Sequence, residues 1–227
     1  FPYTTLFRSP RVFHQIWINR SNPALPEKFS AYRDSWLQRH PGWDYKLWNL
    51  DNLDFVPQRL DLVKSAPSYA QMADVLRYEI LYRHGGIYID TDFECLRSIE
   101  PILEGVQNFA CSEDGLSITN ALIGASPGSV YMQRCVAALP DRVGLAAPTH
   151  ETGPGLLTRT LLGEGLAGDF TLFPREWFYP YNWNELHRAN ETFPNAYAIH
   201  RWAHSWGESD RGLLTRVRRK ALRMLRA

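Results

Sequence analysis

Residues 82–92 read Tyr-Arg-His-Gly-Gly-Ile-Tyr-Ile-Asp-Thr-Asp, and this stretch decides the fold. A helical pattern runs into the pair Gly85-Gly86, and glycine ends helices because the residue just past the last turn is left-handed. The β-branched and aromatic residues 87–89 then predict a short buried strand. Asp90 and Asp92 follow at its exit. Two carboxylates with this spacing indicate oxygen ligands for a hard divalent cation, although an isolated pair also occurs in solvated turns.

The helix that leads into this stretch carries the next candidate residues. Residues 68–71 form a Ser-x-x-Gln capping box, which predicts where the helix begins. Asp74, Arg77 and Tyr78 have the spacing i, i+3 and i+4, so they share one helix face. Asp74 and Arg77 could form a surface ion pair of little energetic value. Their closeness to the two aspartates favours a role in ligand binding.

Alternating strand and helix patterns extend in both directions from this unit. We expect strands at 12–18, 45–48, 108–111, 121–125, 170–173 and 197–199, helices at 27–40, 128–139 and 156–162, and a loop with short helical pieces at 51–67. This alternation is typical of an α/β fold. Ligands of α/β sheets bind outside the carboxyl ends of the strands, which is where Asp90 and Asp92 would lie.

Two aromatic positions lie at the ends of the first and last predicted strands. Trp17 could belong to the core or stack on a nucleobase, and the sequence favours neither reading. His200 begins the cluster His-Arg-Trp-Ala-His-Ser-Trp at 200–206 and could be a packing residue. A histidine at the end of a strand could also supply a further metal ligand, and this is the reading that we prefer.

Composition indicates one folded domain. The 227 residues are 44% hydrophobic and 13% aromatic, which is enough to bury a sizeable core and line a cleft. No apolar run reaches the roughly 18 residues that a membrane-spanning helix needs. Cys95, Cys111 and Cys135 are odd in number and lack metal-site spacing. We therefore expect free thiols in a reducing, cytoplasmic compartment.

Charge is unevenly distributed along the chain. The net charge is +1, but residues 211–227 hold seven Lys or Arg and no acid, which leaves 18 basic against 24 acidic side chains in residues 1–210. Apolar and basic residues of 211–227 fall on opposite sides of a helix, which favours peripheral binding to an anionic membrane surface at its inner face. The alternative is a terminal helix docked by its apolar side. The acidic body argues against nucleic acid as a partner.

The first nine residues, Phe-Pro-Tyr-Thr-Thr-Leu-Phe-Arg-Ser, need a separate explanation. One set of codons for them, TTT CCC TAC ACG ACG CTC TTC CGA TCT, resembles the end of a widely used DNA-sequencing adapter. We expect residues 1–9 to be adapter read-through that packs on nothing, with the natural chain extending upstream of Pro10. Residues 10–210 would then form the domain and residues 211–227 the terminal helix.

Taken together, the motifs resemble a glycosyltransferase family with a DXD sugar-binding region, which includes yeast initiating α-1,6-mannosyltransferases, bacterial capsular polysaccharide transferases and, more distantly, the clostridial glucosylating toxins. The matching stretches run in family order over nearly all of residues 10–206: His-Gln-Ile-Trp at 14–17, Ser-Trp at 35–36 with Pro-Gly-Trp at 41–43, Ala-Asp-x-x-Arg-Tyr at 73–78, Gly-Gly-Ile-Tyr-x-Asp-x-Asp at 85–92, Thr-Gly-Pro at 152–154, and His200 with Ser-Trp at 205–206. The resemblance implies a GT-A type nucleotide-sugar-binding fold, with a mixed, mostly parallel central sheet flanked by helices.

The resemblance also implies an activity. The expected reaction is the retaining, Mn²⁺- or Mg²⁺-dependent transfer of a hexose from a UDP- or GDP-sugar to a saccharide or glycoconjugate acceptor, in the synthesis of capsule or other cell-surface polysaccharide. Retention needs either a covalent nucleophile or same-face attack assisted by the leaving phosphate. No carboxylate in the sequence suggests itself as the nucleophile, so we favour same-face attack.

Carried over by position, the resemblance implies a role for each site residue. The catalytic set would be Asp74, Arg77, Asp90 and Asp92. Asp92 would bind the metal, with His200 as a further ligand. The donor would be bound by Trp17 stacking on its base, by Asp74, Arg77 and Tyr78 around the sugar, by Asp90 at the ribose and sugar, and by Ser205 and Trp206 over the diphosphate. Arg201 stands where the family often has a second histidine or an aromatic residue.

Two other classes of protein compete with this reading. An Asp-x-Asp phosphohydrolase usually carries its aspartates after the first strand, whereas this pair lies far into the chain and is followed by Phe93-Glu94. A non-catalytic protein that binds sugars or nucleotides could keep the same fold. The intact set of Asp74, Arg77, Asp90 and Asp92 argues against such a loss of activity.

Overall fold

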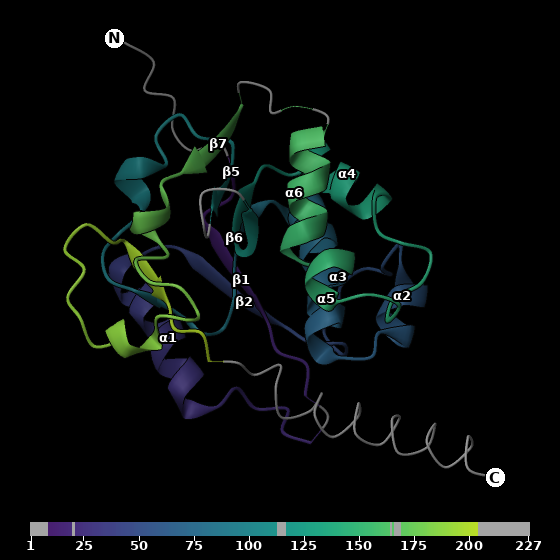
Figure 1. Cartoon of the computed structure of the whole chain (residues 1–227), viewed down its shortest axis with the longest axis horizontal. Helices are drawn as coiled ribbons and strands as arrows, with labels where there is room; N and C mark the ends of the chain where they lie inside the picture. Colours follow the sequence, from purple (N-terminus) through teal and green to yellow (C-terminus); the bar gives the residue numbers. More distant parts are fainter. Residues whose placement is uncertain (1–8, 20, 113–116, 164, 166–168, 204–227) are drawn as a thin grey trace.

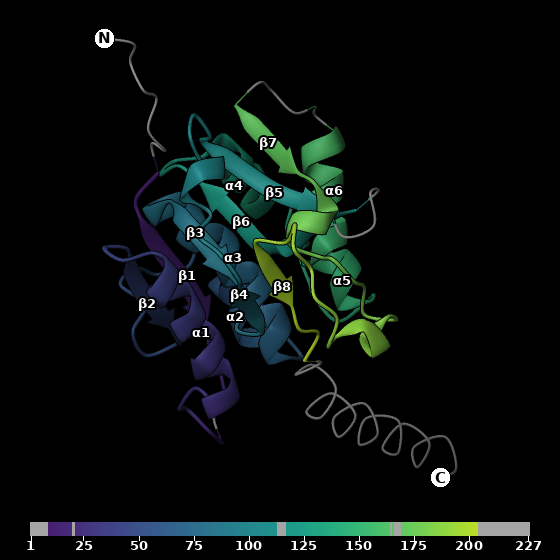
Figure 2. The same cartoon turned by 90° about the vertical axis from the view of Figure 1, so that its left-hand side faces the viewer.

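The computed structural model describes residues 9–19, 21–112, 117–163, 165 and 169–203, and the structural statements below refer to these residues. Their centre is a six-stranded sheet with the order β2-β1-β3-β6-β5-β7 (Figures 1 and 2). β6 is antiparallel to both of its neighbours, and the other paired strands are parallel. The strands are β1 (Val12–Ile16), β2 (Asp44–Trp48), β3 (Gly86–Ile89), β5 (Asn108–Ser112), β6 (Ile118–Ala125) and β7 (Phe170–Phe173). The expected mixed, mostly parallel sheet is therefore confirmed.

A second, two-stranded sheet lies beside the main one. It pairs β4 (Phe93–Cys95) with β8 (Ala198–His200) in antiparallel register, so that Phe93 lies opposite His200. The sequence predicted β8 but not β4. β4 follows Asp92 immediately and has only three residues, which is too short for a hydrophobic period to be recognised.

Helices cover both faces of the main sheet. On one face lie α2 (Leu60–Ser65), α3 (Tyr69–His84), α4 (Val130–Ala137), α5 (Pro148–Glu151) and α6 (Pro154–Gly163). On the other face lie α1 (Glu27–Arg39) and the small sheet, as Figures 1 and 2 show from two directions. Single 3-10 turns occur at Glu100–Ile102, Arg175–Trp177 and Leu186–Arg188. No helix among the described residues is long and apolar enough to cross a membrane.

The strand β3 is buried on both faces, and this explains its uninterrupted apolar sequence. Tyr88 packs into the core beneath α3 and α4. Its neighbours Ile87 and Ile89 pack into the opposite core beneath α1 and β4. Side chains that alternate in this way stabilise both layers at once, because successive residues of a strand point to opposite faces.

Paired glycines end α3 as the sequence predicts. Gly85 has φ +64° and Gly86 has φ +86°. A Cβ added to Gly86 would lie 2.6 Å from Val12 Cγ1, and one added to Gly85 would lie 2.5 Å from Pro127 Cδ. Both the left-handed backbone and the close approach of neighbouring strands therefore require glycine here.

At the start of α3 the capping prediction is half right. The Ser68 hydroxyl accepts from the Gln71 backbone N–H at 3.2 Å. The Gln71 side chain does not return to Ser68; it donates to Glu151 Oε2 at 2.8 Å. The same carboxylate accepts from the backbone N–H groups of residues 144–146, so it holds the loop before α5.

Predictions about the cysteines and the first residues can also be compared with the structure. Cys95, Cys111 and Cys135 are buried free thiols, as expected. Ser9 is buried and donates to Gln107 O at 3.3 Å, so the expectation that residues 1–9 pack on nothing is wrong at this position. Residues 1–8 and 211–227 lie outside the described residues, and the adapter origin and the terminal helix remain predictions.

Candidate active site

The two aspartates lie where the central strand β3 leaves the sheet. Asp90 follows Ile89 and stays tied to β6, because its backbone N–H donates to Ala121 O at 2.8 Å. A tight turn then returns the chain, with the Phe93 N–H donating to Asp90 O at 3.2 Å. The turn brings Asp92 to the junction of the main sheet and the small sheet. The predicted position at the sheet edge is therefore correct.

His200 reaches Asp92 from the end of β8. Its Nε2 lies 3.0 Å from Asp92 Oδ1, and the backbone N–H of Ala203 donates to Asp92 Oδ2 at 2.8 Å. Burial raises the pKa of Asp92, but the imidazole of His200 and the Ala203 N–H outweigh it and hold the pKa below its usual value. Asp92 is therefore an anion at neutral pH.

Asp90, Asp92 and His200 each offer one ligand atom, and these atoms lie within 4.8 Å of one another. Their side chains are 20%, 14% and 10% exposed, so the cluster can be reached from solvent. Carboxylate oxygens with one imidazole nitrogen form a donor set that suits a divalent cation such as Mn²⁺. The residues fit the expected metal, and the structure adds Asp90 to the predicted ligands Asp92 and His200.

A buried ion-pair network on the protein-interior side of the cluster holds Asp90. Arg77 Nη1 lies 3.2 Å from Asp90 Oδ1, and Arg77 Nη2 lies 2.9 Å from Asp74 Oδ1. Arg77 also lies over the Tyr88 ring at 4.4 Å, and the Tyr88 hydroxyl donates to Asp90 Oδ1 at 2.7 Å. The interpretation of Asp74 and Arg77 as an exposed surface pair is thus wrong, because they are 0% and 2% exposed.

Asp74 is held in turn by two polar side chains. Asn120 Nδ2 donates to Asp74 Oδ1 and Thr152 Oγ1 donates to Asp74 Oδ2, both at 2.8 Å. Burial raises the pKa of Asp74 to about 6, while Arg77, Thr152 and Asn120 lower it in part. Asp74 and Arg77 therefore form the buried support of the cluster, and their direct contact with a sugar remains a prediction.

The remaining predicted donor-binding residues lie in different places. Tyr78 is fully buried and donates to Thr152 O at 2.8 Å, which speaks against its predicted contact with the donor. Trp17 is half-buried, packs on Phe29 with ring centroids 5.5 Å apart, and donates to Asn22 O at 3.0 Å. Its stacking on a nucleobase stays a prediction. Ser205 and Trp206 lie outside the described residues.

Arg201 is turned away from the candidate metal ligands. Its backbone N–H donates to Asp92 O at 2.9 Å, while its guanidinium pairs with Glu94 at 2.6 Å. The departure from the family pattern at this position therefore leaves His200 in place. The pairing of β4 with β8, which no single motif encodes, is what sets this geometry.

Sequence reasoning missed residues that position the cluster. Gln15 donates to Asp90 O at 3.2 Å and accepts from the Tyr45 hydroxyl at 2.9 Å. Gln15 is 1% exposed in the middle of a strand, and a buried polar residue in an apolar run was the signal that could have identified it. Asn120 lies one residue before the predicted strand at 121–125, and no such signal marked it.

Comparison with known proteins identifies a family that part of the chain resembles. Residues 26–108, which contain both aspartates and the Asp74–Arg77 pair, match the family described as "Glycosyltransferase sugar-binding region containing DXD motif". This segment of the chain is therefore similar to that family. The DXD glycosyltransferase resemblance seen in the sequence is thus confirmed.

Two relatives match different shares of the chain. Inositol phosphoceramide mannosyltransferase 3 of Schizosaccharomyces pombe is 32% identical over 136 residues, which cover 58% of this chain and 37% of the relative. The matched part is thus well under half of that relative's length. The uncharacterized glycosyltransferase L373 of Acanthamoeba polyphaga mimivirus is 26% identical, over 87% of this chain and 83% of the relative.

Solved structures confirm the GT-A-like fold of this chain. The PaToxG glycosyltransferase aligns with a TM-score of 0.55 at 17% identity, covering 71% of this chain and 72% of that one. The UDP-bound glycosyltransferase domain from the YGT toxin aligns with a TM-score of 0.52 at 10% identity, covering 74% and 80%. At such identities the likeness concerns the fold alone.

Proposed function

We propose that this chain is a retaining, metal-dependent glycosyltransferase that moves a hexose from a nucleoside diphosphate sugar to a saccharide or glycoconjugate acceptor. The observation that carries the proposal is the partly buried cluster of Asp90, Asp92 and His200, which brings together the end of β3 and the end of β8. It lies at the sheet edge where α/β folds bind ligands, directly above the buried pair Asp74–Arg77. The family match supports the same activity.

The reaction forms a bond between an acceptor hydroxyl oxygen and the anomeric carbon while the bond from that carbon to the diphosphate oxygen breaks. The bonding electrons leave with the diphosphate, and the hydroxyl proton passes to the departing phosphate oxygen. A divalent ion held by Asp92 and His200, with Asp90, would offset the charge that develops on the diphosphate. The imidazole among the ligands favours Mn²⁺ over Mg²⁺, because Mg²⁺ prefers oxygen ligands.

The chain's own residues would orient the donor. Arg77 and Tyr88 fix one oxygen of Asp90, so the other side of this carboxylate faces the donor in a single orientation. Preorganised polar groups of this kind need no rearrangement during the reaction. The neighbouring carboxylates are also engaged, Asp74 by Arg77 and Glu94 by Arg201. This supports same-face attack in preference to a covalent glycosyl intermediate.

The biological setting follows from the relatives and from charge. We propose an acceptor of the cell-surface saccharide or glycolipid class, since one named relative is an inositol phosphoceramide mannosyltransferase. The basic residues of 211–227 support peripheral attachment to an anionic membrane on its cytoplasmic side.

The direct experiment incubates the full chain with Mn²⁺ and a panel of UDP- and GDP-linked mannose, glucose, galactose and N-acetylglucosamine. We expect one donor to release its nucleotide in a metal-dependent manner, and EDTA to stop the release. NMR of the product should show that the anomeric configuration of the donor is kept. Donor binding without release would identify a binding protein instead, and an inverted product would overturn the retaining mechanism.

A further inference from the structure

The loop that follows the 3-10 turn Arg175–Trp177 carries an unusually placed tryptophan. Trp183 is 54% exposed, and it is the most exposed Trp, Tyr or Phe side chain among the described residues. Single exposed apolar residues are common on protein surfaces, so exposure alone assigns no role. The evidence for a role is the connection between this loop and the residues next to the Asp92 cluster.

Two contacts tie the loop to the residues that follow His200. The Trp202 indole N–H donates to Tyr181 O at 3.2 Å, and its ring lies 4.1 Å from the His200 ring. The Arg201 guanidinium donates to Ala189 O at 2.7 Å. Both ends of the loop are therefore held by the two residues that follow His200.

The loop is also internally fixed. Asn182 accepts from the Trp183 N–H at 2.7 Å, and Glu185 accepts from the Asn182 N–H at 2.9 Å. The Glu185 carboxylate lies between Arg175 and Arg188, each at 3.3 Å. A rigid aromatic platform loses little conformational entropy when a ligand stacks on it.

We propose that Trp183 is the stacking platform for the acceptor saccharide, with a pyranose ring lying on its indole. The inference rests on the proposed transferase activity and names a binding residue for its second substrate. The residues next to Trp183 in the sequence are polar, namely Asn182, Asn184 and Glu185. They favour a sugar over a lipid chain as the ligand, because inserting them into a bilayer would cost the free energy of removing them from water. Stacked faces of aromatic rings suit the apolar face of a sugar, while amides and carboxylates suit its hydroxyls.

The test measures nucleotide release by the full chain with its donor and Mn²⁺, with and without methyl α-glycosides of mannose, glucose, galactose and N-acetylglucosamine. In Trp183→Ala we expect the acceptor KM to rise about five- to tenfold, the range that one aromatic contact provides. Release without acceptor should stay within about twofold, because the proposal assigns Trp183 to the acceptor and not to the donor. The acceptor KM of Trp183→Phe should lie between those of the parent protein and Trp183→Ala.

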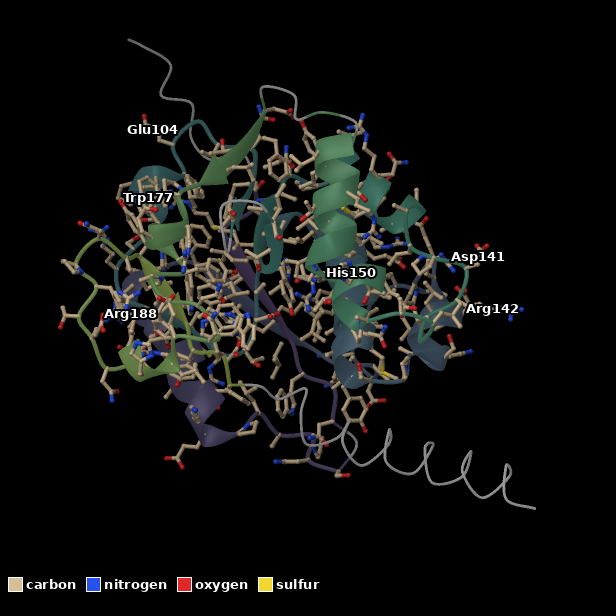
Figure 3. The ribbon with its side chains drawn as sticks, viewed as in Figure 1. Glu104, Asp141, Arg142, His150, Trp177 and Arg188 are labelled. Carbon is tan, nitrogen blue, oxygen red and sulfur yellow. The ribbon has the colours of Figure 1, made fainter. Side chains whose placement is uncertain are left out.

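Leu145→Ala is the matched control. Leu145 is 83% exposed and follows Arg142, which lies on the opposite side of the molecule from Arg188 (Figure 3). Its acceptor KM should equal that of the parent protein. An unchanged acceptor KM in Trp183→Ala would overturn the proposal, as would a panel that neither stimulates release nor shifts the Trp183 indole signal in NMR.

Two further measurements distinguish this proposal from membrane binding by Trp183 and from a failure of the proposed transferase activity. A Trp183→Ala protein that keeps its acceptor KM but loses binding to phosphatidylglycerol vesicles would assign the indole to the membrane and overturn the saccharide role. Absence of metal-dependent release with every donor would instead count against the transferase activity itself. In that case a change in the NMR signal of the Trp183 indole on addition of a glycoside would still support saccharide binding at Trp183.

Discussion

His200 Nε2 lies 3.0 Å from Asp92 Oδ1, and this contact joins residues 108 positions apart in the chain. It exists because β4 and β8 pair with Phe93 opposite His200. The candidate metal site is therefore completed by the last strand and not by the Asp-x-Asp stretch alone. Anything that separates β8 from β4 removes a ligand from the site.

Asp92→Asn should abolish metal-dependent turnover. The amide keeps the shape of the side chain but loses the charge that would bind the cation, so we expect at least a ~100-fold loss of nucleotide release. Titration calorimetry with Mn²⁺ should show the corresponding loss of binding, and circular dichroism should show an intact fold. Turnover within a few-fold of the parent protein would refute the metal role of Asp92.

Arg77→Met should destabilise the fold, because it leaves Asp74 buried without its cation. Removing one partner of a buried ion pair typically costs about 3–5 kcal/mol. Arg33→Met is the control, since Arg33 and Asp34 form a pair at 2.7 Å that is partly exposed, and its loss should cost less than about 1 kcal/mol. Urea unfolding of both variants gives the comparison. Equal free energies of unfolding would contradict the network described for Arg77.

The unit around residues 68–92 could be predicted almost entirely from sequence, because each of its signals is local. Gly85-Gly86 ends α3, apolar residues form β3, and Asp90 and Asp92 emerge at the sheet edge, all as expected. Hydrophobic period and turn chemistry report such features within a few residues. Most of the helices and strands that flank this unit follow from the same signals, with the short elements β4 and α5 as exceptions.

What the sequence could not provide were contacts between distant segments. Asn120, Thr152 and Gln15 hold Asp74 and Asp90, but each partner lies at least 46 positions away. Tyr78 shares a helix face with Asp74 by spacing, yet its longer side chain reaches Thr152 and not the cluster. Spacing on a helix defines a face, while the packing of neighbouring elements decides which atoms meet there.

Residues 211–227 should direct the protein to anionic membranes. Seven basic residues without an acid provide roughly 1 kcal/mol each when they lie near a negatively charged surface. The full chain should co-sediment with phosphatidylglycerol vesicles and release them at high salt, whereas a chain ending at residue 210 should remain in the supernatant. Vesicles of phosphatidylcholine alone serve as the control. Equal binding of both chains to anionic vesicles would assign the membrane contact elsewhere.

His14 should make stability fall as the pH decreases below about 6.5. Its Nδ1 accepts from the Trp48 indole N–H, and its Nε2 lies 3.0 Å from Gly85 O, so the folded protein has no acceptor for a second proton. Burial lowers the pKa of His14 from 6.5 to about 4. Between pH 6.5 and about 4, His14 is therefore protonated in the unfolded chain but neutral in the folded chain. The free energy of unfolding falls by on the order of 2–3 kcal/mol as the pH decreases across that range.

His14→Gln is the variant that isolates this effect. Its free energy of unfolding should depend less on pH between about 6.5 and 4 than that of the parent protein. Asp74 acts in the opposite direction, since burial raises its pKa to about 6 and its contribution falls as the pH rises towards that value. Both proteins contain Asp74, so the difference between their pH profiles reports His14. Parallel profiles would show that His14 is protonated within the fold.

Gly86→Ala should destabilise the protein more than Gly42→Ala does, and only Gly86→Ala should move the site. Both glycines have φ +86°, so each alanine variant incurs the cost of a left-handed residue, about 1–2 kcal/mol. At Gly42 a Cβ would meet nothing within 4 Å, whereas at Gly86 it would lie 2.6 Å from Val12 Cγ1 and 2.8 Å from Val12 O. Overpacking between β1 and β3 adds about 1–3 kcal/mol at Gly86 alone. Because β3 ends at Asp90, urea unfolding and Mn²⁺ affinity should both be impaired in Gly86→Ala, and equal unfolding midpoints for the two variants would show that β1 yields to the extra methyl group.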